Sequence, residues 1–177
     1  MLILLSVLYL FAYLGMIITT IIVTKSDPTD PTVVFDRQLR SSSELNRTAI
    51  DLIQTHAEFY CNVCQAHVIE NSKHCAYCNR CTHEFDHHCR WVSNDIGRTN
   101  YIEFLRMLIF VIITLVLQIT LCVFAINLSE VDDSIMDFQE LIVLNYVTIF
   151  TCAFFLLLVS WLLCFHCYLI RKNITTI

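Results

Sequence analysis

The chain has 177 residues, of which 56% are hydrophobic and only two are glycine and two proline. Its mean hydropathy of +0.63 is well above that of an ordinary soluble domain, so the excess apolar residues must lie in lipid. The formal net charge is −5 and the basic residues never form a run, which excludes a nucleic-acid-binding surface and predicts no nucleic acid partner. We therefore expect an α-helical integral membrane protein.

The first predicted element is a transmembrane span over residues 1–24. Leu2 to Thr24 is apolar apart from hydroxyl residues and one glycine, and about 20 residues of helix are enough to cross a bilayer. A cleaved signal peptide is the alternative, but no basic residue precedes this run and the run is longer than a signal-peptide core. Residues 25–55 follow as a polar linker.

Residues 56–104 carry the metal-binding and nucleophilic side chains. Six of the ten cysteines lie here among histidines, and two cysteines separated by two residues let one tight turn present two thiolates to a zinc ion. If Cys89 is kept for chemistry, seven donors remain for two tetrahedral sites: Cys61, Cys64, His74, Cys75, Cys78, Cys81 and His88. Asp95 is the candidate for the eighth donor, with His83 and His67 as competitors. Because this segment has few apolar residues, we expect zinc to supply much of its folding free energy.

Two further apolar runs follow, and the charges around them predict the topology. We expect spans over residues 105–128 and 141–170, an acidic lumenal loop over 129–140 and a short tail over 171–177. Every lysine and arginine lies between Lys25 and Arg106 or at Arg171 and Lys172, so the positive-inside rule places the cysteine-rich segment and the tail in the cytosol. Thiols stay reduced there, which favours zinc over disulfides.

The residues around this Cys/His spacing match a known pattern. They include Asp86-His87-His88-Cys89, Trp91-Val92, Asn94, Ile96-Gly97-Arg98, Asn100 and Phe104. The combination resembles the cysteine-rich domain of DHHC protein S-acyltransferases, which attach palmitate and related chains to protein cysteines. Asp27-Pro28-Thr29 after the first span and Thr175-Thr176 after the last are similar to two outlying motifs of that family.

The resemblance implies how the donors are shared between two structural zinc ions. One ion would take Cys61, Cys64, His74 and Cys81, and the other Cys75, Cys78, His88 and position 95. The family has cysteine at position 95, so Asp95 would give the second site an oxygen ligand. Arg90 and Thr29 also replace a proline and a glycine of the family pattern.

The resemblance also bears on completeness. The family usually has four spans, two of them before the cysteine-rich domain, and its Thr-Thr-x-Glu motif would end one residue beyond Ile177. We therefore expect a fragment or an incomplete gene model, with a minimal form of the protein as the alternative.

The activity implied is that of a protein-cysteine S-palmitoyltransferase. Cys89 would attack acyl-CoA and pass the palmitoyl group to membrane-proximal cysteines of protein substrates, with His87 as its base and Asp86 orienting that imidazole. Trp91 suits the membrane interface, where the acyl-CoA thioester must sit. Lys73 and Arg98 are candidates to contact the CoA phosphates, as are Arg80 and Arg90, and the alternative is that these four are ordinary basic residues of the cytosolic side. The resemblance implies a multi-pass protein of the Golgi, the endoplasmic reticulum or the plasma membrane.

Two other functions compete with this one. A catalytically impaired relative or fragment would act as a zinc-stabilised membrane scaffold, which Asp95, Arg90 and the missing span motivate. A membrane-anchored RING-type ubiquitin ligase would also interleave two zinc sites, but it needs a final cysteine pair, and no cysteine follows Cys89 before the next span.

Overall fold

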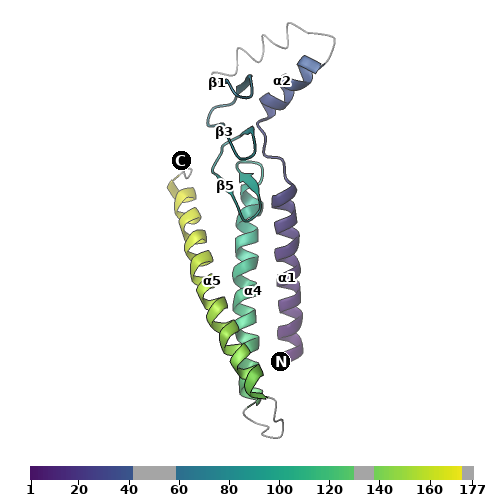
Figure 1. Cartoon of the computed structure of the whole chain (residues 1–177), viewed down its shortest axis with the longest axis vertical. Helices are drawn as coiled ribbons and strands as arrows, with labels where there is room; N and C mark the ends of the chain where they lie inside the picture. The colour runs from purple at the N-terminus through teal and green to yellow at the C-terminus, as the bar shows by residue number, and fades with distance from the viewer. Residues whose placement is uncertain (42–58, 130–137, 173–177) are drawn as a thin grey trace. The chain divides into compact units, whose positions relative to one another are not determined.

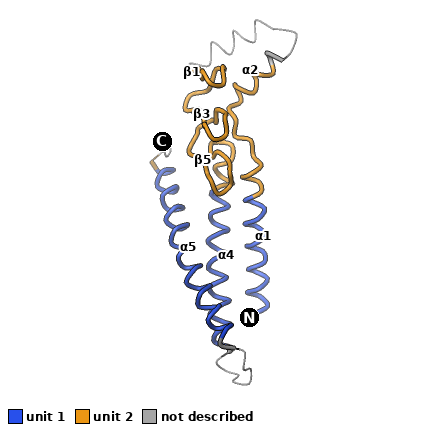
Figure 2. Tube along the Cα trace, in the orientation of Figure 1, with its two compact units in different colours: residues 1–20, 105–171 blue, residues 21–104, 172–177 orange. Residues whose placement is uncertain are grey.

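The computed structural model describes residues 1–41, 59–129 and 138–172 (Figure 1). It divides into two compact units, one made of residues 1–20 and 105–171 and the other of residues 21–104 and 172–177 (Figure 2). Residues 42–58, which include much of the predicted linker (25–55) and the start of the predicted cysteine-rich domain (56–104), lie outside the described residues. So do most of the acidic loop (130–137) and the Thr175-Thr176 motif.

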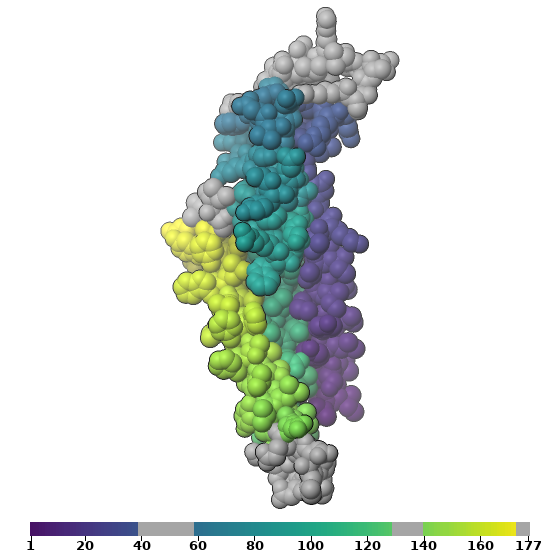
Figure 3. Space-filling model, viewed as in Figure 1, coloured from purple at the N-terminus to yellow at the C-terminus, as the bar shows by residue number. Residues whose placement is uncertain are grey.

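The first unit is built from three helices: α1 (Leu2–Lys25), α4 (Tyr101–Ser129) and α5 (Phe138–Lys172). All three are long and apolar enough to cross a membrane, so the three predicted apolar helices are present. Figure 3 shows one face of the molecule, with α5 in green and yellow. Many large apolar side chains of the three helices are exposed, and Phe150 and Trp161 of α5 are 77% and 79% exposed. An apolar surface of this extent is unusual for a soluble protein.

Helices α1 and α4 pack closely where Gly15 faces Phe110. A Cβ atom at position 15 would lie 2.5 Å from the Phe110 ring, well inside van der Waals contact. The absence of a side chain at Gly15 therefore sets how near the two helices approach.

The second unit contains three antiparallel hairpins of three-residue strands. They are β1 (Phe59–Cys61) with β2 (Ala66–Val68), β3 (Lys73–Cys75) with β4 (Arg80–Thr82), and β5 (His87–Cys89) with β6 (Asn94–Ile96). In each hairpin a cysteine ends the first strand and pairs with the residue five positions later. The residue before that partner has a left-handed backbone in all three turns, with φ of 50° at Gln65, 50° at Asn79 and 49° at Ser93.

Helix α2 (Pro31–Ser41) lies inside the predicted linker and was not foreseen from the sequence. Asp30 is its N-cap, since its carboxylate accepts the Thr32 N–H at 2.8 Å, and Pro31 fills the first helical position, where no N–H is needed. Val33 of α2 packs in a small apolar core with Ala66 and Val68 of β2. A core this small cannot by itself hold three hairpins in place.

Hydrogen bonds of buried polar side chains also hold the hairpins to the start of α2 and to the chain that follows α1. The buried Asp30 carboxylate also accepts the Ile69 N–H at 2.9 Å and the Ser72 hydroxyl at 2.6 Å, which joins the start of α2 to the loop between the first two hairpins. Asn94 and Asn100 bind the chain leaving α1: the Asn94 amide donates to the carbonyls of Val23 and Ser26, and the Asn100 amide donates to the Ser26 hydroxyl.

Candidate functional site

The first cluster of possible metal ligands joins the first two hairpins. Cys61 and Cys64 come from the β1–β2 turn, and His74 and Cys81 from paired positions of β3 and β4. The Nδ1 atom of His74 lies 3.8, 3.3 and 3.9 Å from the sulfurs of Cys61, Cys64 and Cys81. Zn–S and Zn–N bonds of about 2.3 and 2.0 Å place tetrahedral donors about 3.5 Å apart, so these four atoms fit a zinc ion.

The second cluster joins the second and third hairpins. Cys75 and Cys78 come from the β3–β4 turn, and His88 and Asp95 from paired positions of β5 and β6. The Nδ1 atom of His88 lies 3.8 and 3.4 Å from the two sulfurs and 2.9 Å from Asp95 Oδ1. Two thiolates, an imidazole and a carboxylate are all zinc donors, so Asp95 can complete this set.

Asp95 is held by its other oxygen. Its Oδ2 atom lies 3.2 Å from the Thr82 hydroxyl and 3.4 Å from Arg80 Nε, while the same guanidinium bonds Asp27 at 3.1 Å and also reaches the Asn94 side chain. Burial alone would raise the pKa of Asp95, but hydrogen bonds from Cys75, His88, Cys78 and Thr82 outweigh it and lower that pKa. The carboxylate is therefore ionised, with Oδ1 left to face the cluster.

Two thiols of the clusters, Cys78 and Cys81, resist ionisation without a cation. Burial, with smaller contributions from Cys61 and Cys64, raises the pKa of Cys81. Burial followed by Asp95 raises the pKa of Cys78 to about 11. A divalent cation would remove this penalty, because metal ligands bind as thiolates.

The two competing histidines do not join either cluster. His67 lies in β2 and packs edge-on against Tyr60 at 5.2 Å between ring centroids. His83 follows β4, with Nε2 3.9 Å from Glu84. The Nδ1 atoms of both are buried without a hydrogen-bond partner.

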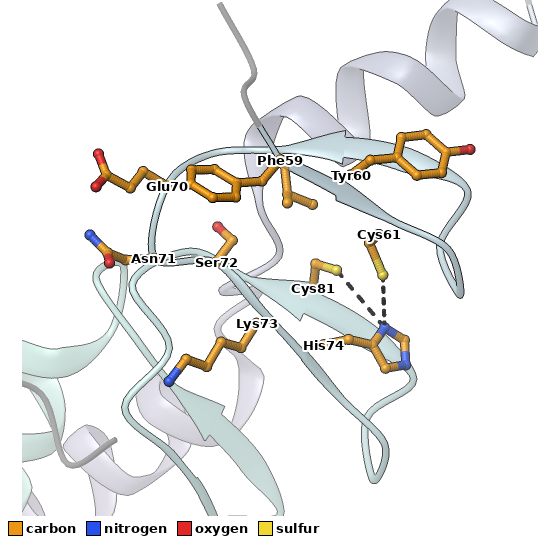
Figure 4. Close-up of a pocket in the computed structure, with 10 residues that line it drawn as sticks. Phe59, Tyr60, Cys61, Glu70, Asn71, Ser72, Lys73, His74 and Cys81 are labelled. Carbon is orange, nitrogen blue, oxygen red and sulfur yellow. Dashed lines mark hydrogen bonds between the residues drawn. The ribbon is translucent and has the colours of Figure 1, made fainter.

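A pocket of about 470 Å³ opens beside the first cluster (Figure 4). Its lining combines the aromatic rings of Phe59 and Tyr60 with Cys61, His74 and Cys81 of the cluster. Lys73 borders the same pocket, and its amine points away from the sulfurs (Figure 4).

The β5 strand separates two roles over three residues. Side chains two apart in a strand share a face, so His87 and Cys89 lie opposite to His88, which faces the second cluster. Asp86 precedes them, and its Oδ2 atom is 2.7 Å from His87 Nδ1, which leaves Nε2 of that ring for Cys89. Phe104 packs edge-on against the His87 ring at 5.3 Å, and both Asp86 and Cys89 are buried.

The electrostatics of this group favour a thiolate. Burial alone would raise the pKa of Cys89, but the hydrogen bond to His87 and the backbone N–H groups of Val92 and Trp91 lower it. Burial alone would likewise lower the pKa of His87, but Asp86 and Cys89 raise it to about 9. His87 therefore shifts Cys89 toward the thiolate, which is the reactive form of the side chain.

Comparison with known proteins gives the family of the chain. A family model described as DHHC palmitoyltransferase matches residues 54–177, which include both clusters and the Asp86-His87-Cys89 group. The chain belongs to this family. The resemblance drawn from the sequence is therefore confirmed.

Curated relatives agree with this assignment. Over 125 residues the chain is 33% identical to probable protein S-acyltransferase 13 of Arabidopsis thaliana, an alignment that covers 70% of this chain and 41% of the relative. It is 35% identical over 91 residues to palmitoyltransferase ZDHHC17 of Danio rerio, covering 50% and 14% respectively. It is 31% identical over 125 residues to palmitoyltransferase ZDHHC18 of Homo sapiens, an alignment that covers 66% of this chain and 30% of that relative. The chain therefore spans less than half the length of these relatives.

The three residues predicted to contact acyl-CoA lie in different parts of this DHHC domain. Trp91 is in the β5–β6 turn and is 89% exposed. Arg98 follows β6, and its guanidinium pairs with Glu84. Lys73 begins β3 and borders the pocket described above.

Some contributors to the DHHC site were missed from the sequence. The amides of Trp91 and Val92 are backbone groups and leave no mark in residue type. Arg80 and Thr82 were not linked to Asp95, because 15 and 13 residues separate them and only the hairpin pairing brings them together.

Proposed function

We propose that this chain carries the catalytic domain of a membrane-embedded protein S-acyltransferase, with Cys89 as the nucleophile. The observation that supports this best is the Asp86-His87-Cys89 group, in which a 2.7 Å contact between Asp86 and His87 orients the imidazole and the imidazole stabilises the thiolate of the buried Cys89. A thiolate is the species that attacks a thioester.

In the first step the Cys89 sulfur attacks the carbonyl carbon of a palmitoyl-CoA thioester. The bond from that carbon to the CoA sulfur breaks, and the leaving CoA thiolate takes a proton from the His87 imidazolium. Cys89 now carries the acyl chain as a thioester, and His87 is neutral with Nδ1 bonded to Asp86.

In the second step a cysteine of a membrane-associated protein replaces CoA. Its thiol gives its proton to His87 and its sulfur attacks the acyl carbon, so the acyl chain leaves on the substrate and Cys89 returns as a thiolate beside the imidazolium. Asp86 stabilises the charged imidazole in each half of the cycle.

Two zinc ions would fix the hairpins that present these groups. The first would be held by Cys61, Cys64, His74 and Cys81, and the second by Cys75, Cys78, His88 and Asp95. Their part is structural, because all four positions of each set are protein donors. Since His88 lies between His87 and Cys89 in β5, ligation of His88 would hold the strand that carries both.

Membrane insertion of α1, α4 and α5 is part of this proposal. The exposed apolar side chains of these helices support it, as does the confinement of lysine and arginine to one set of flanks, which would place the DHHC domain (56–104) in the cytosol. Palmitoyl chains would lie among the helices, while Trp91, Lys73 and Arg98 would meet the interface and the CoA phosphates.

The test uses the full chain purified with zinc in detergent and an alkyne analogue of palmitoyl-CoA. We expect a label that hydroxylamine removes, absent in Cys89→Ser and kept in Cys164→Ser, whose thiol is exposed in α5. No label on protein that holds its zinc would favour the scaffold alternative. A label that persists in Cys89→Ser would show that another cysteine reacts.

A further inference from the structure

The three hairpins repeat with a constant spacing of 14 residues. Their first strands begin at Phe59, Lys73 and His87, and their second strands at Ala66, Arg80 and Asn94. The cysteine that ends the first strand recurs as Cys61, Cys75 and Cys89, and the left-handed residue four positions later recurs as Gln65, Asn79 and Ser93. The turn that holds Cys89 is thus the third copy of one structure.

Each metal cluster follows one rule within this repeat. A hairpin supplies its cysteine and the residue three positions later, and the next hairpin supplies the residue before its own cysteine and the residue six positions after it. The first cluster is Cys61 and Cys64 with His74 and Cys81, and the second is Cys75 and Cys78 with His88 and Asp95. His67 occupies the sixth position in the first hairpin, where no earlier hairpin stands in the described residues, and it packs on Tyr60 instead.

In the third hairpin the rule assigns Cys89 and Val92 to the metal-binding pair. Helix α4 begins at Tyr101, where the next hairpin would have to supply the remaining donors. The backbone around the first sulfur is nevertheless arranged alike, because in each turn that sulfur accepts the N–H groups two and three residues later. These are Val63 and Cys64, then Tyr77 and Cys78, then Trp91 and Val92.

We propose that the third hairpin is a zinc knuckle in which Val92 replaces the second thiol and the first thiol, Cys89, is left free to react. The turn keeps the geometry of a metal-binding pair, with the same strand register and the same left-handed residue four positions after its cysteine. Only the description of Cys89 as a nucleophile rests on the proposed function. The geometric inference predicts that one substitution, Val92→Cys, creates a third site for a soft divalent cation.

The test compares Val92→Cys with Val92→Ser in the full chain, in detergent, under reducing conditions, with Cd²⁺ as the probe. The thiol introduced at position 92 would release its proton to solvent as it binds. We expect Val92→Cys to bind one more Cd²⁺ per chain than Val92→Ser, with added thiolate-to-cadmium absorbance, and Cd²⁺ to protect Cys89 from iodoacetamide only in Val92→Cys. The double variant Cys89→Ser/Val92→Cys should lose the extra ion.

Two results would overturn the inference. One is a Val92→Cys protein that keeps its structural zinc but binds no extra Cd²⁺. The other is an extra ion that remains after Cys89→Ser, which would place it elsewhere. Neither readout requires acyl transfer, so a failure of the proposed enzymatic function would leave the result of this test unchanged.

Discussion

Replacing Asp30 with alanine tests how the loop between the first two hairpins is held to the start of α2. The Asp30 carboxylate is fully buried and accepts the N–H groups of Thr32 and Ile69 at 2.8 and 2.9 Å, and the hydroxyls of Thr32 and Ser72 at 2.5 and 2.6 Å. Alanine removes all four contacts at once while leaving the helix α2 sequence unchanged.

The expected loss of stability follows from these contacts. Loss of the N-cap costs about 1 kcal/mol. Leaving the Ile69 N–H and the Ser72 hydroxyl without their charged acceptor costs about 1–3 kcal/mol together, since the hydroxyl can turn to another partner. A total of about 3 kcal/mol corresponds to a fall in Tm of roughly 6–12 °C for a chain of this size.

Thermal unfolding of the zinc-loaded full chain in detergent, followed by intrinsic fluorescence, measures this shift. Asp30→Asn should fall between the parent and Asp30→Ala, because an amide keeps one acceptor for Thr32 but turns an NH₂ group toward Ile69 or Ser72. Asp27→Ala is the matched control, since the Asp27 side chain is 70% exposed and its ion pair with Arg80 should contribute under about 1 kcal/mol. If Asp30→Ala unfolds no earlier than Asp27→Ala, the four contacts do not hold this unit together.

Four further outcomes are expected. His87→Ala should raise the pKa of Cys89 toward the ordinary thiol value of about 8.5, so the pH profile of iodoacetamide alkylation should move to higher pH. At neutral pH, alkylation should slow and acyl transfer should fall about 100-fold. An unchanged pH profile would show that His87 does not stabilise the Cys89 thiolate. Arg80→Ala should speed the release of zinc from the second cluster to a chelator by about tenfold, but it should have no such effect in a protein that also carries Asp95→Cys. Arg98→Ala is the control and should leave zinc release unchanged, because Arg98 pairs with Glu84. Equal effects of Arg80→Ala with and without Asp95→Cys would show that Arg80 does not act through Asp95. Gly97→Ala should lower Tm and reduce zinc content, because its Cβ would lie 2.6 Å from the His83 carbonyl, and a normal Tm would show that the loop yields. Removing zinc with a chelator should abolish the near-ultraviolet dichroism of the hairpins while α1, α4 and α5 keep their far-ultraviolet helix signal, and retained hairpin signal would show that metal is not needed for folding.

The elements that could be predicted are those with a recognisable local pattern of residue types. Apolar runs predicted α1, α4 and α5, and the pairs of cysteines separated by two residues predicted the candidate metal ligands that the structure brings together. Helix α2 was missed because its apolar contacts are few, although Asp30-Pro31 is a start signal. The 14-residue period was present in the sequence but is shorter than the repeats of solenoid proteins.

Other features depend on contacts between distant positions. Asp30 meets Ile69 and Ser72 only once the first hairpin packs on α2, and nothing in its local sequence distinguishes it from an exposed cap. The charge state of Cys89 depends on amide groups and on a left-handed turn at Ser93, a conformation that serine seldom adopts. Geometry of this kind is decided by folding rather than by composition.

Successive side chains of β5 point to opposite faces of the strand, and this affects how such a domain can change during evolution. Asp95 lies opposite His88 in the strand register, on the side of the hairpin that faces the metal cluster, whereas His87 and Cys89 face the other way. A substitution among the candidate metal donors can therefore occur without altering the face of the strand that carries His87 and Cys89. A single-residue insertion in β5 would have the opposite effect, because it would exchange the two faces of the strand and displace the candidate metal donor and the proposed nucleophile together.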